Sequence, residues 1–372
     1  MPGVYVHLPF CPYLCPYCDF AKWPWRATRA RRYLDALYRE IDRAPAERAT
    51  TLFLGGGTPN AYAADDVVEL LHRLTQRFGP FGEASIEVNP ELVVEGDFEA
   101  YHSAGITRVS IGVQSFEAGE IATLGRKHDV NDVVQAVRQA RDARIESVSL
   151  DLMFAVPGQS PESWRRSLRA GIATGVDHVS CYGLTVEAGT PFERWLEREP
   201  RAFFDDTAEA ELYQIAIDEL AVAGFEHYEI SNFARPGHRC AHNQNYWANG
   251  GYLGLGVGAA SYRGGVRRTA TRSFDEYVEA LERDGEVPAD SECLTGFRRA
   301  GEAIMLALRT SDGVAFEDFR RRYGVDVERH YASILTRYAG DGLLERAAGG
   351  MRLTERGRFL ANEVCGAFVT FD

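Results

Sequence analysis

Hydrophobic and polar residues alternate along the chain with two periods, which together predict a succession of strands and helices. Short apolar runs rich in β-branched residues predict strands, and apolar residues spaced three and four apart predict helices. Strands are expected from residue 4 and at 51–54, 85–88, 108–113, 147–152, 178–182 and 227–230. Helices are expected at 28–43, 97–103, 131–143, 161–174 and 205–223, with another that ends at Phe78 and is capped by Asp65 or Asp66. Such alternation is typical of a parallel α/β sheet or barrel.

Polar and glycine-rich segments follow several of these strands directly. They are Gly55–Pro59, Glu87–Pro90, Gln114-Ser115 and Asp151. In a parallel barrel the carboxyl ends of the strands form one face, and the active site lies there. We therefore expect these segments to meet in a single pocket with the loop that follows the first strand.

The periodicity changes after about residue 237. Residues 237–265 are rich in Gly, Asn and aromatic residues, whereas 291–372 is mostly helical, with helices expected at 294–308, 316–323 and 327–338. Strands at 343–346 and 351–353 flank Ala347–Gly350 as a β-hairpin, and a last helix starts near Thr354. We predict three regions: an α/β barrel (1–235), a linker region that closes the barrel (236–290) and a winged-helix-like domain (291–372).

Charge and composition exclude several classes of protein. The net charge of the 372 residues is −13, which opposes general nucleic-acid binding. Residues 291–372 contain 12 arginines, no lysine and 12 acidic residues, so the winged-helix-like region lacks the basic face that DNA binding needs. We expect no secretion signal, because the first residues lack the basic-then-apolar pattern, and no apolar run is long enough to span a bilayer. A reducing, cytoplasmic location is expected.

Three of the seven cysteines, Cys11, Cys15 and Cys18, fall within eight positions on the first loop. Three thiolates there can hold three irons of a cubane cluster and leave the fourth iron open to chelate a substrate or cofactor. A structural zinc site is the alternative, but it needs four ligands, and no fourth follows at the usual spacing. A disulfide network is disfavoured by the odd cysteine count.

These motifs together resemble the radical S-adenosylmethionine superfamily and, within it, the haem chaperone family of the coproporphyrinogen-III-oxidase-like branch. The resemblance runs from Tyr5 to at least Tyr262, through segments 51–60, 105–116, 151–164, 187–192 and 228–234. It implies a partial (β/α)6 TIM-like barrel. It also implies a [4Fe–4S] cluster held by Cys11, Cys15 and Cys18.

The resemblance further implies a set of residues that bind S-adenosylmethionine. These are Tyr5, Tyr17, Gly56, Gly57, Thr58, Glu87, Gln114, Arg126 and Asp151. Glycines suit a site where backbone N–H groups approach a carboxylate closely. Each position also has a structural alternative: Gly55–Gly57 as a tight turn, Asp151 as a loop cap, and Glu87 paired with Arg126.

Two features distinguish the chaperones from the oxygen-independent coproporphyrinogen III dehydrogenases of this branch. The dehydrogenases carry another cysteine one residue beyond the third cluster ligand, whereas this chain has Cys18-Asp19-Phe20. His242-Asn243-Gln244-Asn245-Tyr246-Trp247 matches the haem-binding motif of the family, so His242, Tyr246 and Trp247 are expected to contact haem. Alternatively, His242 and Trp247 merely close the barrel mouth.

The chain departs from the family pattern at two places near this motif. Ala260 stands where the family has a histidine, and Ala241 stands where arginine is common. Cys240, close by, is a candidate second haem ligand. The resemblance implies a cytoplasmic haem chaperone that delivers haem to respiratory haem proteins. Peripheral contact with the inner face of the cytoplasmic membrane and a homodimer are both compatible with the sequence. A coproporphyrinogen III dehydrogenase and a radical enzyme on another substrate stay open as alternatives.

Overall fold

A computed structural model describes residues 3–347 and 349–369 of the chain. Its main feature is a twelve-stranded sheet with the order β14-β13-β12-β11-β1-β4-β5-β6-β7-β8-β10-β9. Six consecutive strands at its centre are parallel and in sequence order. They are β1 (Gly3–Leu8), β4 (Thr51–Gly56), β5 (Glu83–Val88), β6 (Arg108–Gln114), β7 (Ser147–Phe154) and β8 (His178–Gly183).

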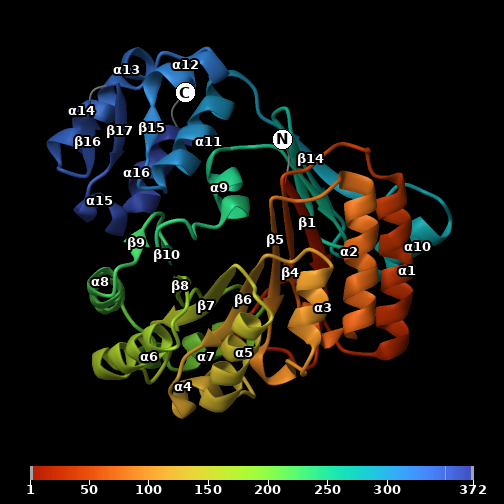
Figure 1. Cartoon of the computed structure of the whole chain (residues 1–372). Helices are drawn as coiled ribbons and strands as arrows, with labels where there is room; N and C mark the ends of the chain where they lie inside the picture. The colour runs from red at the N-terminus through yellow and green to blue at the C-terminus, as the bar shows by residue number, and fades with distance from the viewer. Residues whose placement is uncertain (1–2, 348, 370–372) are drawn as a thin grey trace.

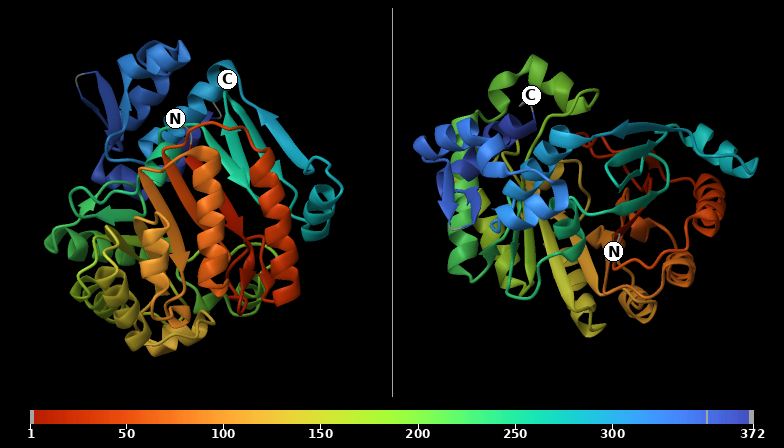
Figure 2. Two further views of the ribbon diagram at one scale, coloured as in Figure 1. Left: turned by 45° about the vertical axis from the view of Figure 1, so that its right-hand side comes forward. Right: turned by 90° about the horizontal axis from the view of Figure 1, so that it is seen from above.

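Helices connect these strands and cover the outer face of the sheet (Figure 1). They are α1 (Ala27–Arg43), α2 (Ala64–Phe78), α3 (Asp97–Ser103), α4 (Ala118–Thr123), α5 (Val130–Asp142), α6 (Pro161–Ala173), α7 (Pro191–Arg198) and α8 (Asp206–Val222). The view from above in Figure 2 shows them around the outside of a curved sheet. Each helix buries one apolar stripe against the strands, as Tyr33, Leu34, Leu37 and Ile41 of α1 do. The predicted partial (β/α)6 barrel is confirmed.

Several predicted elements differ in detail. No side chain caps α2: it begins after Ala63, and Asp65 and Asp66 lie in its first turn, where their charge still favours the helix N-terminus. The prediction of a strand at 227–230 is wrong. The chain forms the short β9 (Glu226–His227), turns, and returns as β10 (Asn232–Ala234), antiparallel to β8. The helix expected at 327–338 is split at Tyr331 into α13 (Val327–His330) and α14 (Ala332–Gly340).

The region after residue 236 extends the other edge of the same sheet. Strand β11 (Tyr252–Leu255) pairs in parallel with β1, and β12 (Ala260–Arg263), β13 (Val266–Ala270) and β14 (Ala289–Cys293) follow in antiparallel order. The seven-residue helix α9 (Ala241–Trp247) precedes β11, and α10 (Phe274–Glu282) packs against α1. A small parallel pair, β2 (Phe10–Cys11) and β3 (Trp23–Pro24), brackets the cysteine loop.

The C-terminal residues form a unit with a hydrophobic core of its own, separate from that of the barrel. It contains α11 (Gly296–Leu308), α12 (Phe316–Tyr323), α13, α14, α15 (Glu355–Phe359) and α16 (Ala361–Val369). A three-stranded sheet, β15 (Val314–Ala315), β17 (Gly350–Leu353) and β16 (Leu344–Ala347), completes it. Strands β16 and β17 form the predicted hairpin, whose connection includes Ala348, outside the described residues. Figure 1 shows this unit on the side of the molecule opposite α1 and α2.

Candidate functional site: two connected cavities inside the barrel

A cavity of about 330 Å³, here called the cluster cavity, lies at the carboxyl ends of the parallel strands. All three clustered cysteines and eight of the nine residues predicted to bind S-adenosylmethionine line it. These eight are Tyr17, Gly56, Gly57, Thr58, Glu87, Gln114, Arg126 and Asp151. Only Tyr5 is absent from this set, because it points into a neighbouring cavity. The structure therefore brings together the strand ends that the sequence pattern predicted would meet.

Backbone hydrogen bonds fix both ends of the cysteine loop. Trp23 N donates to Pro9 O at 2.8 Å, and Trp25 N donates to Cys11 O at 2.8 Å. Cys11 is buried, and its burial raises the pKa of the thiol to about 11. Cys15 and Cys18 are partly exposed, and all three are free thiols. Without a metal, Cys11 is thus a neutral thiol at neutral pH.

The three cysteines and Arg126 are the residues that would hold and flank a [4Fe–4S] cluster. In the described part of the chain, no three His, Cys, Asp or Glu side chains converge on a point that could hold one metal ion. The thiolates of a cubane bind three different irons, so their sulfurs need not converge. The guanidinium of Arg126 lies beside them, with Nη1 4.0 Å from Cys15 Sγ. Bound there, a [4Fe–4S] cluster would supply one-electron chemistry and an open iron.

The glycine loop after β4 has no room for side chains. Gly56 has a φ of 100°, in the region that favours glycine, and its N–H donates to Glu87 Oε2 at 2.9 Å. A Cβ on Gly57 would lie 2.4 Å from the carbonyl oxygen of Leu8. The loop therefore packs against the strand that leads into Cys11. Gly57 N donates to Leu8 O and Thr58 N donates to Phe10 O, each at 2.9 Å, so the N–H groups of this loop are engaged within the protein.

Two carboxyl groups also line the cavity, and both residues are half-buried. Burial, with a smaller effect from the nearby Asp151, raises the pKa of Glu87 to about 7, while the Gly56 N–H opposes the change. Burial also raises the pKa of Asp151, although the Ser110 hydroxyl donates to it at 2.9 Å. Such buried carboxyl groups are stabilised by a cationic partner, and the ammonium group of S-adenosylmethionine provides one. The residues present thus fit this ligand.

Arg126 and Gln114 each have an unusual environment at the strand ends. Arg126 is buried, and its Nη2 donates to Asn89 Oδ1 at 2.9 Å, while its Nε has no partner. This arrangement excludes the structural alternative of a direct Glu87–Arg126 pair. Gln114 has a φ of 67°, unusual for a side chain, at an irregularity in the pairing of β6 with β7. Backbone strain of this kind clusters at functional sites.

A second cavity of about 590 Å³, here called the barrel cavity, adjoins the first inside the sheet. Phe20, Gly56, Glu87 and Tyr182 line both cavities. Tyr5, His7, His242, Tyr246 and Ala260 are among the other lining residues. Tyr5, the predicted site residue missing from the cluster cavity, is therefore found here.

Helix α9 places His242 at the amino ends of the strands. Its backbone N–H donates to Glu83 Oε1 at 2.8 Å, and its Nδ1 lies 2.9 Å from Thr51 Oγ1. Glu83 and Thr51 are the first residues of β5 and β4. The cluster cavity lies at the opposite ends, across a strand length of roughly 17–20 Å for six residues. His242 therefore lies at the end of the barrel that is remote from the cluster cavity.

Two other residues near the motif face away from the barrel cavity. The ring of Trp247 lies under the guanidinium of Arg309, with Cζ 5.3 Å from the ring centroid, and its Nε1 is buried without a partner. Cys240 is buried, and its Sγ lies 3.5 Å from Glu83 Oε1. Neither residue lines the cavity. Trp247 therefore contacts the C-terminal unit, and Cys240 packs at the base of the sheet.

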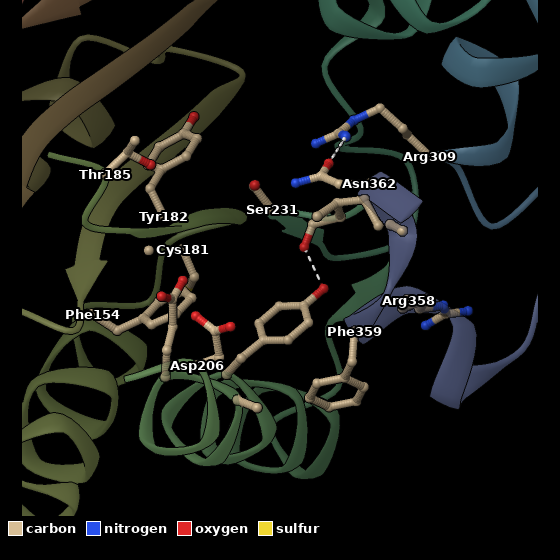
Figure 3. Close-up of a pocket in the computed structure, with 16 residues that line it drawn as sticks. Phe154, Cys181, Tyr182, Thr185, Asp206, Ser231, Arg309, Arg358, Phe359 and Asn362 are labelled. Carbon is tan, nitrogen blue, oxygen red and sulfur yellow. Dashed lines mark hydrogen bonds between the residues drawn. The ribbon is translucent and has the colours of Figure 1, made fainter. Parts of the chain in front are cut away.

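A third cavity, of about 530 Å³, lies between the barrel and the C-terminal unit. Figure 3 shows Tyr182 and Thr185 on one side of it and Arg309 with Asn362 on the other. Arg309 Nη1 donates to Asn362 Oδ1 at 3.1 Å. Tyr182 lines all three cavities, so this side chain lies where they adjoin. Sequence reasoning missed Tyr182, although its position at the end of β8 matches that of the other site residues.

Comparisons with known proteins agree with this geometry. The family model described as "Radical SAM superfamily" matches residues 5–171, and the model described as "HemN C-terminal domain" matches residues 295–360. The structure of the coproporphyrinogen III oxidase HemN from Escherichia coli superimposes with a TM-score of 0.86, at 24% identity, over 100% of this chain and 91% of that one. The chain is therefore a radical SAM protein with a HemN-type C-terminal domain.

Full-length relatives narrow the class further. Heme chaperone HemW from Bacillus subtilis (strain 168) is 32% identical, over 99% of each chain. Heme chaperone HemW from Mycobacterium tuberculosis (strain ATCC 25618 / H37Rv) is 35% identical, over 97% of this chain and 93% of that protein. The chain belongs to the HemW family of the radical SAM superfamily. Its expected cofactors are accordingly a [4Fe–4S] cluster and S-adenosylmethionine.

Proposed function

We propose that this protein is a haem chaperone: it binds haem in the barrel cavity and passes it to respiratory haem proteins, while the cluster cavity holds the iron–sulfur cluster and S-adenosylmethionine. The observation that carries the proposal is the barrel cavity itself. It is large, it is lined by aromatic side chains and by His242 and Tyr246, and it adjoins the cluster cavity at Glu87 and Tyr182. The full-length similarity to proteins named heme chaperone HemW supports the same function.

In this proposal, different residues of the cluster cavity bind different parts of S-adenosylmethionine. Cys11, Cys15 and Cys18 hold the cluster, and Gly56 to Thr58 lie where the methionine end of the ligand is held. Glu87 and Asp151 accept from its ammonium group, and Arg126 and Gln114 bind its polar atoms. Tyr17 lies beside the thiols and offers a ring on which adenine can stack.

In this proposal the chain consists of two domains joined by an intervening region. Residues 1–235 form the barrel that holds the cluster, residues 236–290 carry the haem motif, and residues 291–372 form the winged-helix-like domain. The middle region continues the barrel's sheet through β11, which supports treating it as the part that completes the barrel cavity. Trp247, turned towards Arg309, joins the haem motif to the C-terminal domain.

Anaerobic reconstitution with two rival ligands tests the proposal. The protein, loaded with iron, sulfide and S-adenosylmethionine, is given either haem or coproporphyrinogen III with a reductant. We expect retention of one haem per chain, with a Soret band, and no decarboxylated product. Conversion of coproporphyrinogen III, with no retained haem, would instead identify a dehydrogenase despite Asp19-Phe20 in place of its extra cysteine. Formation of 5′-deoxyadenosine with neither ligand would indicate another substrate.

We further propose that transfer takes place on the cytoplasmic side of the membrane, where the recipients take up haem. No helix among the described residues is long and apolar enough to cross a bilayer. Peripheral contact would be seen as co-sedimentation with anionic vesicles, and a homodimer as a doubled mass in light scattering. Transfer itself is measured as haem-dependent activation of an apo-cytochrome.

A further inference from the structure

The imidazole of His242 is enclosed on every side that the structure describes. The residue is 0% exposed. Its Nδ1 lies 2.9 Å from Thr51 Oγ1 and its Nε2 lies 2.8 Å from the Tyr246 hydroxyl. Phe53 stacks near its face at a centroid distance of 5.4 Å, and Gly3 packs against the Cε1–Nδ1 edge so closely that an added Cβ would lie 3.1 Å away. A haem iron has no free nitrogen to bind here.

His7, the other histidine that lines the barrel cavity, also has both ring nitrogens in hydrogen bonds. His7 Nδ1 lies 2.9 Å from the Tyr5 hydroxyl, and His7 Nε2 lies 2.7 Å from Ala21 O. Among the described residues that line the cavity, His7 and His242 are the two histidines, and each has both ring nitrogens in hydrogen bonds. Axial ligation by imidazole would require one of these bonds to break.

Tyr246 lines the barrel cavity next to His242. Its hydroxyl contacts Nε2, its ring meets that of His242 edge to face at 4.8 Å, and its side chain lines the barrel cavity. Tyrosinate is an established axial ligand of ferric haem. When the Tyr246 hydroxyl donates to Nε2 of His242, the ring hydrogen is on Nδ1, which donates to Thr51 Oγ1. This pair of hydrogen bonds orients the imidazole so that Nε2 can receive a proton.

We propose that the protein ligand of ferric haem is the phenolate oxygen of Tyr246, with His242 as the positioning residue that takes its proton. The inference rests on the proposed haem-binding function. As the Fe–O bond forms, the O–H bond of Tyr246 breaks and the proton passes to Nε2 of His242. The iron stays ferric throughout, so no electron donor or acceptor is required.

Tyr5 is the rival phenol, because it also contacts a histidine. Burial raises the pKa of both phenols, and neighbouring groups raise it further, Glu87 for Tyr5 and Tyr252 with Cys240 for Tyr246. Tyr252 meets Tyr246 edge to face at 4.6 Å and serves as the matched control. Variants of all three tyrosines therefore distinguish the two candidates.

Resonance Raman and absorption spectra of the ferric haem complex test the assignment. The wild-type complex is expected to show bands of iron-bound tyrosinate. Tyr246→Phe should lose them and bind haem at least tenfold more weakly, whereas Tyr252→Phe should retain them. His242→Phe, which keeps an aromatic ring but cannot accept a proton, should weaken the bands and the affinity without shifting ligation to another residue. Circular dichroism confirms that each variant is folded.

Three outcomes would overturn the assignment. The first is an imidazole-type low-spin spectrum that His242→Phe abolishes and Tyr246→Phe leaves intact. The second is loss of the tyrosinate bands in Tyr5→Phe but not in Tyr246→Phe. The third is retained haem with no tyrosinate bands in the wild type. If the wild type retains no haem at all, the proposed function itself fails, and this result is distinct from the other three.

Discussion

At the residue scale, the barrel buries carboxyl groups where charge is costly. Glu229 is 3% exposed, and its Oε1 has no hydrogen-bond partner among the described residues. Burial raises its pKa to about 7, although the backbone N–H of Ser231, the Asn232 side chain and Arg309 oppose the change. It lies at the junction with the C-terminal unit, where Ile230 N donates to Arg309 O at 3.1 Å. The folded protein therefore holds a proton on Glu229 that the unfolded chain releases.

This shift predicts how stability depends on pH. Between about pH 4.5 and 7 the folded state binds more protons than the unfolded state, so the free energy of unfolding falls as the pH rises through this window. Glu229→Gln mimics the protonated group and removes this contribution. We expect equal stability of the two proteins near pH 4.5 and a gain of about 3 kcal/mol for the variant above pH 7.

Urea denaturation across this pH range measures the difference. Glu87, whose pKa is raised in the same direction, is present in both proteins, so the comparison isolates Glu229. A constant difference at all pH values would contradict the prediction.

The glycine loop gives a second test with single residues. In Gly57→Ala the new Cβ meets backbone atoms of Leu8, Pro9 and Phe10, which cannot rotate away. We expect a loss of about 1–3 kcal/mol in the free energy of unfolding and weaker binding of S-adenosylmethionine, because the strand entering the cysteine loop is displaced. The control is Gly119→Ala in α4, where a Cβ meets nothing within 4 Å. Calorimetry and ligand titration should leave this control within about 1 kcal/mol of wild type.

At the scale of elements, helix α9 depends on a carboxylate from a different part of the chain. The side chain of Glu83, at the start of β5, accepts from Ala241 N at 2.9 Å and from His242 N at 2.8 Å. No side chain of the helix's own N-cap residue, Cys240, makes such a bond. The orientation of the haem motif is therefore fixed by the sheet.

Removal of this contact should weaken haem binding specifically. Glu83→Ala leaves two amides of α9 without their acceptor, and loss of a cap of this kind costs about 0.5–2 kcal/mol. We expect haem affinity to fall by roughly 2- to 30-fold, while S-adenosylmethionine affinity stays unchanged at the far end of the barrel. Glu211→Ala, an exposed position on α8, is the control. An equal loss of both affinities would show that the sheet itself had been disturbed.

At the scale of the whole molecule, one barrel holds two sites at opposite ends of the same strands. The cluster cavity is built on strand carboxyl ends, and α9 closes the barrel cavity at the amino ends. They adjoin through Glu87, Tyr182, Gly56 and Phe20. Glu87 and Gly56 line both cavities, whereas the three clustered cysteines line the cluster cavity alone, so loss of the cluster should leave haem binding largely intact.

The cysteines allow this separation to be measured. In a Cys11→Ala, Cys15→Ala, Cys18→Ala variant we expect complete loss of reconstituted iron and sulfide and of S-adenosylmethionine binding. Haem affinity should change by less than about threefold, since none of these thiols lines the barrel cavity. Iron and sulfide analysis beside a haem titration provides both readouts. Loss of haem together with the cluster would place the haem on the cluster side instead.

The sequence by itself determined the barrel and the cluster end of the site. The two periods of hydrophobicity predicted the six parallel strands and their helices, because each element buries one face. The spacing of Cys11, Cys15 and Cys18, and the polar residues at strand ends such as Glu87 and Asp151, predicted one cavity. This inference needs only the rule that parallel strands share a carboxyl edge.

Only the tertiary structure determined how the residues at the haem end of the barrel are arranged. Three features of this end leave no local pattern in the sequence. They are the antiparallel return of β10, the orientation of Trp247 towards Arg309 and the enclosure of His242. The bond that orients His242 joins it to Thr51, 191 positions away, and Glu83 positions α9 across 159 positions. Periodicity and motif spacing report contacts between near neighbours, whereas these contacts arise only when the sheet brings distant segments together. The sequence therefore identified the motif, but only the folded chain showed that both ring nitrogens of His242 are already hydrogen-bonded, one of them to Tyr246.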